Sequence, residues 1–287
     1  MNDSPLPASS GNVETWSGKN RNDENFPVGS FLIRRSLRPH VHAYYAFARN
    51  ADDIADSPVL RPDDKIARLD AMEAVLMGKR DTGSPSAAAL RASLAETGVP
   101  MVHATDLLIA FRRDAIKTRY ETIDELYNYC RYSAVPVGRY VLDLHGEHHE
   151  CRSPSDALCI ALQVLNHIQD CAKDLAELNR CYIPRVLLDH FGASVDDLRR
   201  PAETPGLRRV FITLLDRVDR LNQAASELPM IARDWRLRLE TGVIHGLANR
   251  LRRRLATGDP LAGRVALSKI DFVLAAFASI RFLGPPR

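Results

Sequence analysis

The sequence lacks the short motifs that identify several common enzyme classes. No glycine-rich phosphate-binding loop, GxSxG or HExxH pattern occurs in its 287 residues. Neither a nucleotide-binding fold, a serine hydrolase nor a zinc protease is therefore indicated. The net charge is only +3, and no basic run is interleaved with aromatic residues, so we expect no nucleic-acid partner.

Cysteine pairs and long apolar runs are also missing. The five cysteines are an odd number and none forms a CxxC pair, which is typical of free thiols in a reducing compartment. The N-terminus has no apolar signal region, and the apolar run at residues 272–278 is too short to span a bilayer. These absences predict a soluble, cytoplasmic protein, which an apolar substrate would still draw into peripheral contact with the inner membrane.

Alternating apolar and polar residues, the pattern of a half-buried strand, are absent as well. Residues 1–24 are rich in Ser, Gly, Asn and Pro and predict a flexible tail, whereas residues 25–287 predict one all-α domain. Pro136 and its small neighbours lie inside a helical pattern, where we expect them to kink the helix or to widen it for a ligand. The predicted helices cover residues 39–56, 62–78, 85–97, 100–117, 122–146, 154–178, 184–190, 194–200, 205–227, 229–256 and 266–282.

What the chain does contain is an acidic cluster in the first of these helices. In YAFARNADDIAD, Tyr45, Arg49, Asp52 and Asp56 recur at spacings of three and four residues, with Asp53 beside them, so they share one helix face. A solvated ion-pair stripe has the same spacing. However, the flanking residues are among the most apolar of the chain, and a buried helix cannot hold several carboxylates without cations.

A second acidic cluster follows in LNHIQDCAKD. Asn166, Asp170 and Asp174 place hard oxygen ligands along one line of a helix, with few lysines nearby. Two such clusters facing one cavity would form a carboxylate cage for Mg²⁺, and Mg²⁺ usually brings phosphate with it. Arg180 and Tyr182 come just after this cluster, where a guanidinium can grip a diphosphate through two hydrogen bonds.

Two other charged segments receive a plainer interpretation. HGEHHE at residues 145–150 matches no zinc-ligand spacing, and we expect no catalytic metal there. The basic run at residues 247–258 predicts a solvated helix face.

Three motifs together resemble the squalene/phytoene synthase family: YAFARNADDIAD, YETIDELYNYCRYSAVPVG and LNHIQDCAKDLAELNRCYIP, in this order and spacing. The resemblance implies an all-α isoprenoid-synthase fold around a central cavity, where two DxxxD helices bind Mg²⁺ and the substrate diphosphate. The implied metal ligands are Asp52, Asp56, Asn166, Asp170 and Asp174. The implied substrate-binding residues are Arg49, Asp53, Gln169 and Arg180, with Ala134 and Gly138 lining the prenyl tunnel. The implied catalytic residues are Tyr45, Tyr120 and Tyr182.

Gln169 departs from the family pattern, because the family commonly has Arg before the second acidic pair. This glutamine, the NFPVGSFLIRR segment and the SAVPVGR segment resemble the hydroxysqualene synthase branch of bacterial hopanoid pathways. In that branch, presqualene diphosphate would be ionised and the rearranged carbocation captured by water, without NADPH. Neighbouring enzymes of the same pathway are the partners that this resemblance implies.

Two alternatives remain at this point. A head-to-head prenyltransferase would join two prenyl diphosphates to presqualene diphosphate, squalene or phytoene. A non-catalytic helical relative that binds lipid would keep the fold without the acidic pairs, and here all four aspartates are present.

Overall fold

The computed structural model describes residues 12–14 and 32–284, and within these ranges every regular element is a helix. The predicted all-α class is therefore confirmed. An isolated bridge between Arg119 and Cys181 is the one β-type pairing in the described part. The α-helices are α1 (Arg38–Asp56), α2 (Pro62–Leu76), α3 (Pro85–Thr97), α4 (Val102–Ile116), α5 (Ile123–Ser133), α6 (Val135–His145), α7 (Arg152–Gln169), α8 (Cys171–Leu178), α9 (Arg185–His190), α10 (Pro205–Ala225), α11 (Leu228–Ile231), α12 (Trp235–Thr257) and α13 (Lys269–Ser279). Short 3-10 helices cover His149–Cys151, Val195–Arg199 and Ile280–Leu283.

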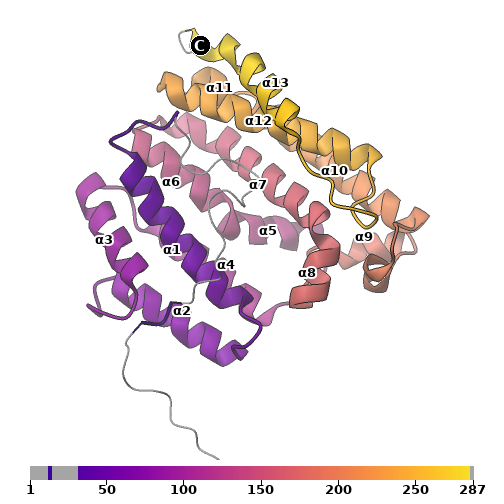
Figure 1. The fold of residues 1–287 in the computed structure, drawn as a ribbon, viewed down its shortest axis with the longest axis horizontal. Helices are drawn as coiled ribbons and strands as arrows, with labels where there is room; N and C mark the ends of the chain where they lie inside the picture. Colours follow the sequence, from indigo (N-terminus) through magenta and orange to yellow (C-terminus); the bar gives the residue numbers. More distant parts are fainter. Residues whose placement is uncertain (1–11, 15–31, 285–287) are drawn as a thin grey trace, which may run out of the picture.

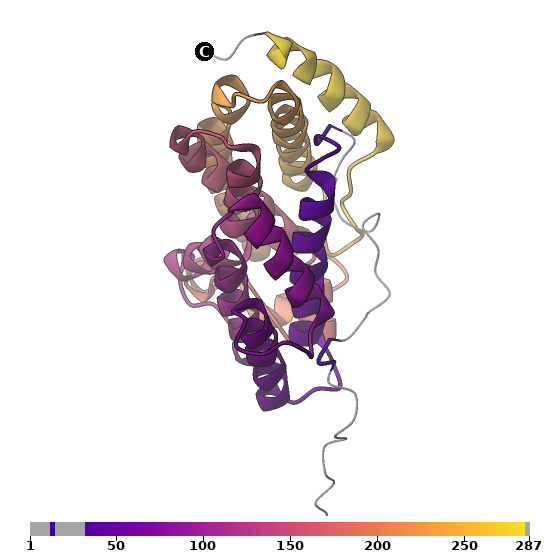
Figure 2. The ribbon, with the colours of Figure 1, turned by 90° about the vertical axis from the view of Figure 1, so that its left-hand side faces the viewer.

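The helices pack around two hydrophobic clusters. The first joins α1 to α2, α3 and α4, and the second is built mainly from α5, α7, α10 and α12 (Figure 1). Helices α4 and α6 contact elements of both groups and hold them together. Helix α13 lies outermost and packs on α12 (Figure 2).

The apolar stripe of helix α1 determines where its acidic residues lie. Its buried residues Tyr44, Phe47, Ala51 and Ile54 recur at spacings of three and four, so they form one stripe against α3 and α4. The acidic residues occupy the neighbouring face. Burial of the apolar stripe fixes the rotation of α1 and therefore the direction of its carboxylates.

Two of the long predicted helices are interrupted. The expected helix 122–146 divides at Ala134, whose φ of −122° and ψ of −44° leave the helical region. The kink expected from Pro136 is confirmed there, because proline has no N–H to continue the helical ladder. The expected helix 154–178 divides at Asp170 (φ −106°, ψ 9°) between α7 and α8.

The C-terminal helices also differ from the prediction. The expected helix 229–256 is wrong, because the chain leaves the helix after Ile231 and starts α12 at Trp235. Asp234 caps this new start by accepting a hydrogen bond from the Arg236 N–H (2.8 Å). The predicted segment 194–200 is a 3-10 helix.

Most of the expected N-terminal tail (1–24) lies outside the described residues. Residues 12–14 are described and lie against the start of α3. The Val13 N–H donates to the Gly83 carbonyl (2.7 Å). The Glu14 carboxylate accepts hydrogen bonds from the Ser86 N–H (2.8 Å) and the Ser84 hydroxyl (2.6 Å). This carboxylate satisfies donors at a helix N-terminus, where negative charge is favoured.

Among the helices of residues 12–14 and 32–284, none combines the length and the hydropathy that crossing a membrane requires.

We expect Gly138 to be essential for the packing of α6 on α7. A Cβ at this position would lie 2.6 Å from both Cys159 Sγ and Ser155 Oγ. Gly138→Val should therefore lower the free energy of unfolding by about 1–3 kcal/mol, measured by urea denaturation. Gly263→Val is the matched control, because a Cβ at Gly263 meets no atom within 4 Å. Equal losses in the two variants would contradict this account.

Candidate active site

The candidate site is an apolar cavity with acids at one end. The cavity has a volume of about 290 Å³ and lies among α1, α6, α7 and α12. Tyr45 and Ala48 of α1 line it, and the acids of α1 begin one helical turn later. Leu158 and Leu162 of α7 line it as well, and Asn166 follows one turn later. Both helices thus present apolar residues first and oxygen ligands next.

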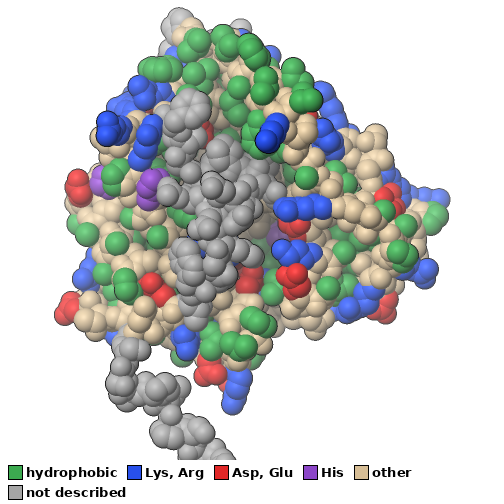
Figure 3. Space-filling model, in the orientation of Figure 1, with side chains coloured by type: hydrophobic (Ala, Val, Ile, Leu, Met, Phe, Trp, Pro, Cys, Tyr) green, Lys and Arg blue, Asp and Glu red, His purple; other side chains and the backbone are tan. Residues whose placement is uncertain are grey.

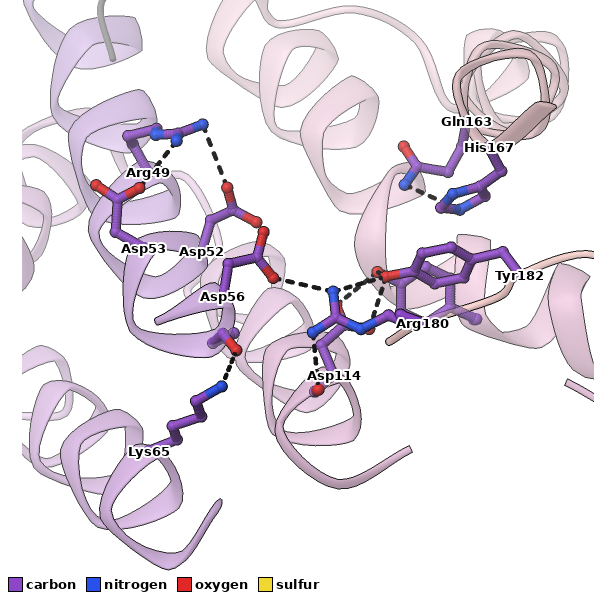
Figure 4. Close-up of polar contacts among 12 residues, drawn as sticks. Arg49, Asp52, Asp53, Asp56, Lys65, Asp114, Gln163, His167, Arg180 and Tyr182 are labelled. Carbon is purple, nitrogen blue, oxygen red and sulfur yellow. Dashed lines mark hydrogen bonds and ion pairs between the residues drawn. The ribbon is translucent and has the colours of Figure 1, made fainter. Parts of the chain in front are cut away.

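Arg49 organises the first acidic cluster. Its guanidinium pairs with Asp53 (Nη2–Oδ1, 2.8 Å) and with Asp52 (Nη1–Oδ2, 3.2 Å) (Figure 4). Removal from water and then the neighbouring charge of Asp56 raise the pKa of Asp52 well above its usual value, although Arg49 opposes the shift. One arginine therefore does not neutralise this cluster.

Arg180 links the first cluster to the rest of the site. Its Nη1 donates to Asp56 Oδ1 (2.9 Å), and its Nη2 donates to the Asp114 carbonyl (2.8 Å). Only 4% of Arg180 is exposed. Its Nη1 also lies 3.1 Å from the Tyr182 hydroxyl. A residue beyond α8 thereby holds the C-terminal end of α1 against α4.

Aromatic rings pack directly against this arginine. Tyr182 stacks on His167 (centroids 3.7 Å apart) and on Tyr120 (5.3 Å). Tyr129 completes the cluster and donates to Asp114 Oδ2 (2.7 Å). Burial and then the charge of Arg180 lower the pKa of His167 to about 3, so this ring is neutral at physiological pH. The Tyr120 hydroxyl is buried, and no described residue offers it a hydrogen bond.

The second acidic cluster faces the first. Asp170 lies at the break between α7 and α8, and Asp174 lies one turn into α8. Burial, followed by the charges of Asp170 and Asp56, raises the pKa of Asp174 to about 7. The Arg180 N–H donates to the Asp174 carbonyl (3.1 Å), and the Arg180 guanidinium donates to Asp56 of α1 (2.9 Å), so one residue connects the two acidic clusters. The structure thus brings together the aspartates that the sequence singled out.

The donor set of this space fits a divalent cation. Arg49 and Arg180 are already engaged with the first cluster, and no described cation forms an ion pair with Asp170 or Asp174. Carboxylate oxygens are the ligands that Mg²⁺ prefers, and crowded acids at raised pKa values gain most from such an ion. Asp52, Asp56, Asp170 and Asp174, with Asn166 beside them, remain the predicted ligands.

The predicted tunnel residues divide into two groups. Gly138 lines the apolar cavity together with Tyr45. Ala134 lies at the α5–α6 break and is not among the described residues that line this cavity. The binding roles of Ala134 and Gly138 and the catalytic role of Tyr45 remain predictions.

The Gln169 side chain is bonded to a segment far away in the sequence. The side chain is buried, and its Nε2 donates to the Val265 carbonyl (2.5 Å) in the segment between α12 and α13. An arginine at this position would bring a positive charge into the same buried place. The glutamine instead connects the second acidic cluster to the C-terminal part of the chain. Contact with a diphosphate remains a prediction.

Sequence reasoning missed Asp114. This residue accepts hydrogen bonds from Tyr129 and Tyr182 (2.7 and 2.9 Å) and lies 3.7 Å from Arg180 Nε. Burial raises its pKa to about 6, against the opposing effect of Arg180. The available signal was one acid on the buried stripe of α4, three residues after Phe111. Such an acid needs a cation partner, but the sequence does not identify which one.

Lys65 and Gln163 were also not predicted as site residues. Lys65 Nζ donates to the Ala55 carbonyl (2.8 Å) near the end of α1, and burial followed by the charge of Arg180 lowers its pKa. Gln163 Nε2 lies 3.3 Å from His167 Nε2. Both residues border the site that Figure 4 shows.

The HGEHHE segment lies apart from these residues. His148, His149 and Glu150 place one ligand atom each within 4.8 Å of one another, and the last two residues are exposed. They precede the start of α7, whereas Asp170 follows its other end.

Comparison with known proteins agrees with this geometry. The model of the squalene/phytoene synthase family matches residues 19–271. The chain belongs to this family. A hydroxysqualene synthase of Rhodopseudomonas palustris is 48% identical over 93% of this chain and 91% of its own length. A hydroxysqualene synthase of Sinorhizobium fredii is 44% identical over 88% of this chain and 86% of its own length.

A solved structure of the same family extends the match to three dimensions. Squalene synthase HpnC from Alicyclobacillus acidocaldarius superposes with a TM-score of 0.68 at 37% identity, covering 79% of this chain and 88% of that one. The resemblance found in the three motifs is therefore confirmed. As a squalene/phytoene synthase, the chain is an enzyme whose substrate is a prenyl diphosphate.

We expect Asp114 to be structurally necessary in this squalene/phytoene synthase. Asp114→Asn removes a buried charge that Arg180 and two tyrosines share, and should lower the free energy of unfolding at pH 7.5 by about 3 kcal/mol. The control is Glu121→Gln, which removes a charge from the half-exposed Arg185 pair and should cost less than about 1 kcal/mol. Chemical denaturation measures both, and similar losses would show that the buried network carries no special weight.

Proposed function

We propose that this enzyme ionises presqualene diphosphate and captures the rearranged carbocation with water, releasing hydroxysqualene and diphosphate. Identities of 48% and 44% to hydroxysqualene synthases over about nine tenths of the chain support this reaction. The observation that carries it is the arrangement of the site: two acidic helix ends meet beside an apolar cavity of about 290 Å³. A diphosphate attached to a hydrocarbon has the same division into a charged head and an apolar body.

Arg49 and Arg180 are the residues suited to the diphosphate head. Both guanidiniums point into the acidic space, where their pairs with Asp52, Asp53 and Asp56 hold them in place (Figure 4). Negative charge builds on the leaving diphosphate as the C–O bond breaks, and fixed cations stabilise it. Mg²⁺ held by Asp52, Asp56, Asn166, Asp170 and Asp174 would supply further positive charge to that leaving group.

The aromatic cluster is suited to the cation that remains. Tyr120 and Tyr182 stack on each other, and both are buried next to Arg180. Ring faces attract a carbocation, and exclusion of bulk water keeps it from being quenched too early. The Tyr120 hydroxyl, which no described residue engages, is available to orient a water molecule or a leaving group. The catalytic roles of Tyr45, Tyr120 and Tyr182 are part of this proposal.

Condensation of two prenyl diphosphates is the competing reaction within the family. Gln169 favours water capture, because an uncharged amide bonded to the Val265 carbonyl takes the place of the arginine common in that motif. One positive charge less near the diphosphate is compatible with an enzyme that handles a single diphosphate at a time.

The purified enzyme should convert presqualene diphosphate into hydroxysqualene in the presence of Mg²⁺ and without NADPH, as measured by mass spectrometry of the extracted products. Farnesyl diphosphate alone should stay unchanged. Its consumption would instead support condensation. If neither substrate reacts and Mg²⁺ does not promote binding of a diphosphate analogue, the non-catalytic alternative is favoured.

The acidic pairs should be required for turnover. Asp52→Ala or Asp170→Ala removes one predicted metal ligand and should lower kcat by at least about 100-fold, while the helical circular dichroism stays unchanged. Asp63→Ala is the matched control, because its side chain is 88% exposed and its ion-pair partner is the exposed Arg61. Activity at the wild-type level in either site variant would refute the proposed cage.

A further inference from the structure

Helix α13 is oriented opposite to an ordinary surface helix. The residues that it buries are Asp271, Ala275 and Ser279, which recur every four residues and are small or polar. Its large apolar residues lie on the outer face. A surface helix usually turns its apolar stripe toward the core.

The contact with α12 fixes this orientation. A Cβ at Gly246 would lie 3.2 Å from Ala275, and one at Gly242 would lie 2.7 Å from the Phe282 ring, so these glycines allow a close approach that a side chain would disturb. Asp271 pairs with Arg254 (2.7 Å) and accepts a hydrogen bond from the Ser268 N–H (2.7 Å). The outward direction of the large side chains is therefore specified by several contacts at once.

The outer face formed by α13 and the 3-10 helix Ile280–Leu283, here called the α13 face, is large and apolar. Figure 3 shows hydrophobic side chains gathered along the upper edge of the molecule, where Figure 1 places α13. Phe277 is 68% exposed and Val273 is 53% exposed. A contiguous patch of this kind marks a contact surface. Its exposed members are Ile270, Phe272, Val273, Leu274, Phe277, Ile280 and Leu283.

The exposed charges within the α13 segment itself have one sign. Lys269 and Arg281 lie at its two ends, and both are exposed. Asp271 is the one acid between residues 262 and 284, and it is buried and paired. The half-exposed Trp235, with the Arg236 guanidinium 5.0 Å from its ring, begins the helix on which α13 packs. Arg238 joins that helix start to the C-terminal segment through the carbonyls of Phe282 and Gly284.

We propose that the α13 face docks this enzyme on an anionic lipid bilayer. Apolar side chains at the spacing of one helix face, flanked by basic residues and an exposed tryptophan, are the features of a helix that lies in the membrane interface. The apolar residues enter the acyl boundary while Lys269 and Arg281 remain at the level of the anionic headgroups.

A second copy of the chain fits the charges less well. Face-to-face pairing of two α13 helices would bring Lys269 and Arg281 of both copies together, in either direction, with no exposed acid on the face to offset them. An anionic surface attracts Lys269 and Arg281 at the same time.

The position of the face has a functional consequence, which rests on the proposed function. The cavity side of α12 contributes Leu237, Thr241 and Ile244 to the apolar cavity, and α13 packs on another side of the same helix. One helix layer thus separates the docking face from the space for the hydrocarbon. Substrate and product of the proposed reaction both carry a long apolar chain that partitions into a bilayer, and docking would place the enzyme where they reside.

Co-sedimentation with vesicles tests the docking surface. The wild-type protein should sediment with vesicles of phosphatidylcholine containing phosphatidylglycerol. Val273→Ser combined with Phe277→Ser should raise the lipid concentration for half-maximal binding at least about tenfold. Val102→Ser combined with Ile116→Ser is the matched control on α4, at exposed fractions of 49% and 64%, and should leave binding unchanged. Lys269→Gln combined with Arg281→Gln should remove the preference for phosphatidylglycerol over pure phosphatidylcholine.

The thermal midpoint of each variant shows that it is folded. Absence of wild-type binding to anionic vesicles, or equal binding by the α13 variant, would overturn the proposal. So would conversion of a wild-type dimer to a monomer by the α13 variant, in sedimentation velocity, with vesicle binding intact. Because no substrate is present, this result is independent of the proposed reaction, which is assayed separately in detergent solution.

Discussion

The buried ion pairs of Arg180 hold together three segments that are distant in the sequence. Its guanidinium binds Asp56 at the end of α1 and the backbone of Asp114 in α4, and Arg180 itself follows α8. Burying these charges costs much of what their attraction returns, so the network contributes position more than stability. Its effect is to hold one acidic cluster at a fixed place opposite the other. The apolar packing of α1 on α3 and α4 then sets the direction of the carboxylates.

The carboxylates of the acidic space outnumber the cations that pair with them, and this excess of negative charge suits the space to binding a cation. The raised pKa values of Asp52 and Asp174 show that the folded chain tolerates their charges poorly without further cations. A protein selected for stability alone would replace such acids. A cation bound between the two pairs, as proposed above, would complete the charge balance.

The sequence was sufficient for the helical class and for the two acidic pairs, because both depend on local spacing. It was insufficient where the outcome depends on a partner. Asp114 belongs to the site only because Arg180 and two tyrosines reach it from elsewhere. No proline or glycine near Asp170 signals the helix break there, whereas Pro136 signals the break between α5 and α6. The bond from Gln169 to Val265 joins residues that no local pattern relates.

The outward orientation of α13 depends on the residues of both α12 and α13. Rotating this helix by half a turn would bury Phe277 and Val273, which normally favours folding by about 1.5–3 kcal/mol per side chain. The same rotation would place large side chains in the close contact between α12 and α13 at Gly246, where the small Ala275 now lies, and would take Asp271 away from Arg254. The close contact at Gly246 and the ion pair of Asp271 together outweigh the gain from burying these side chains. Several specific contacts therefore keep this apolar surface exposed, and a bilayer is the environment in which its exposure costs nothing.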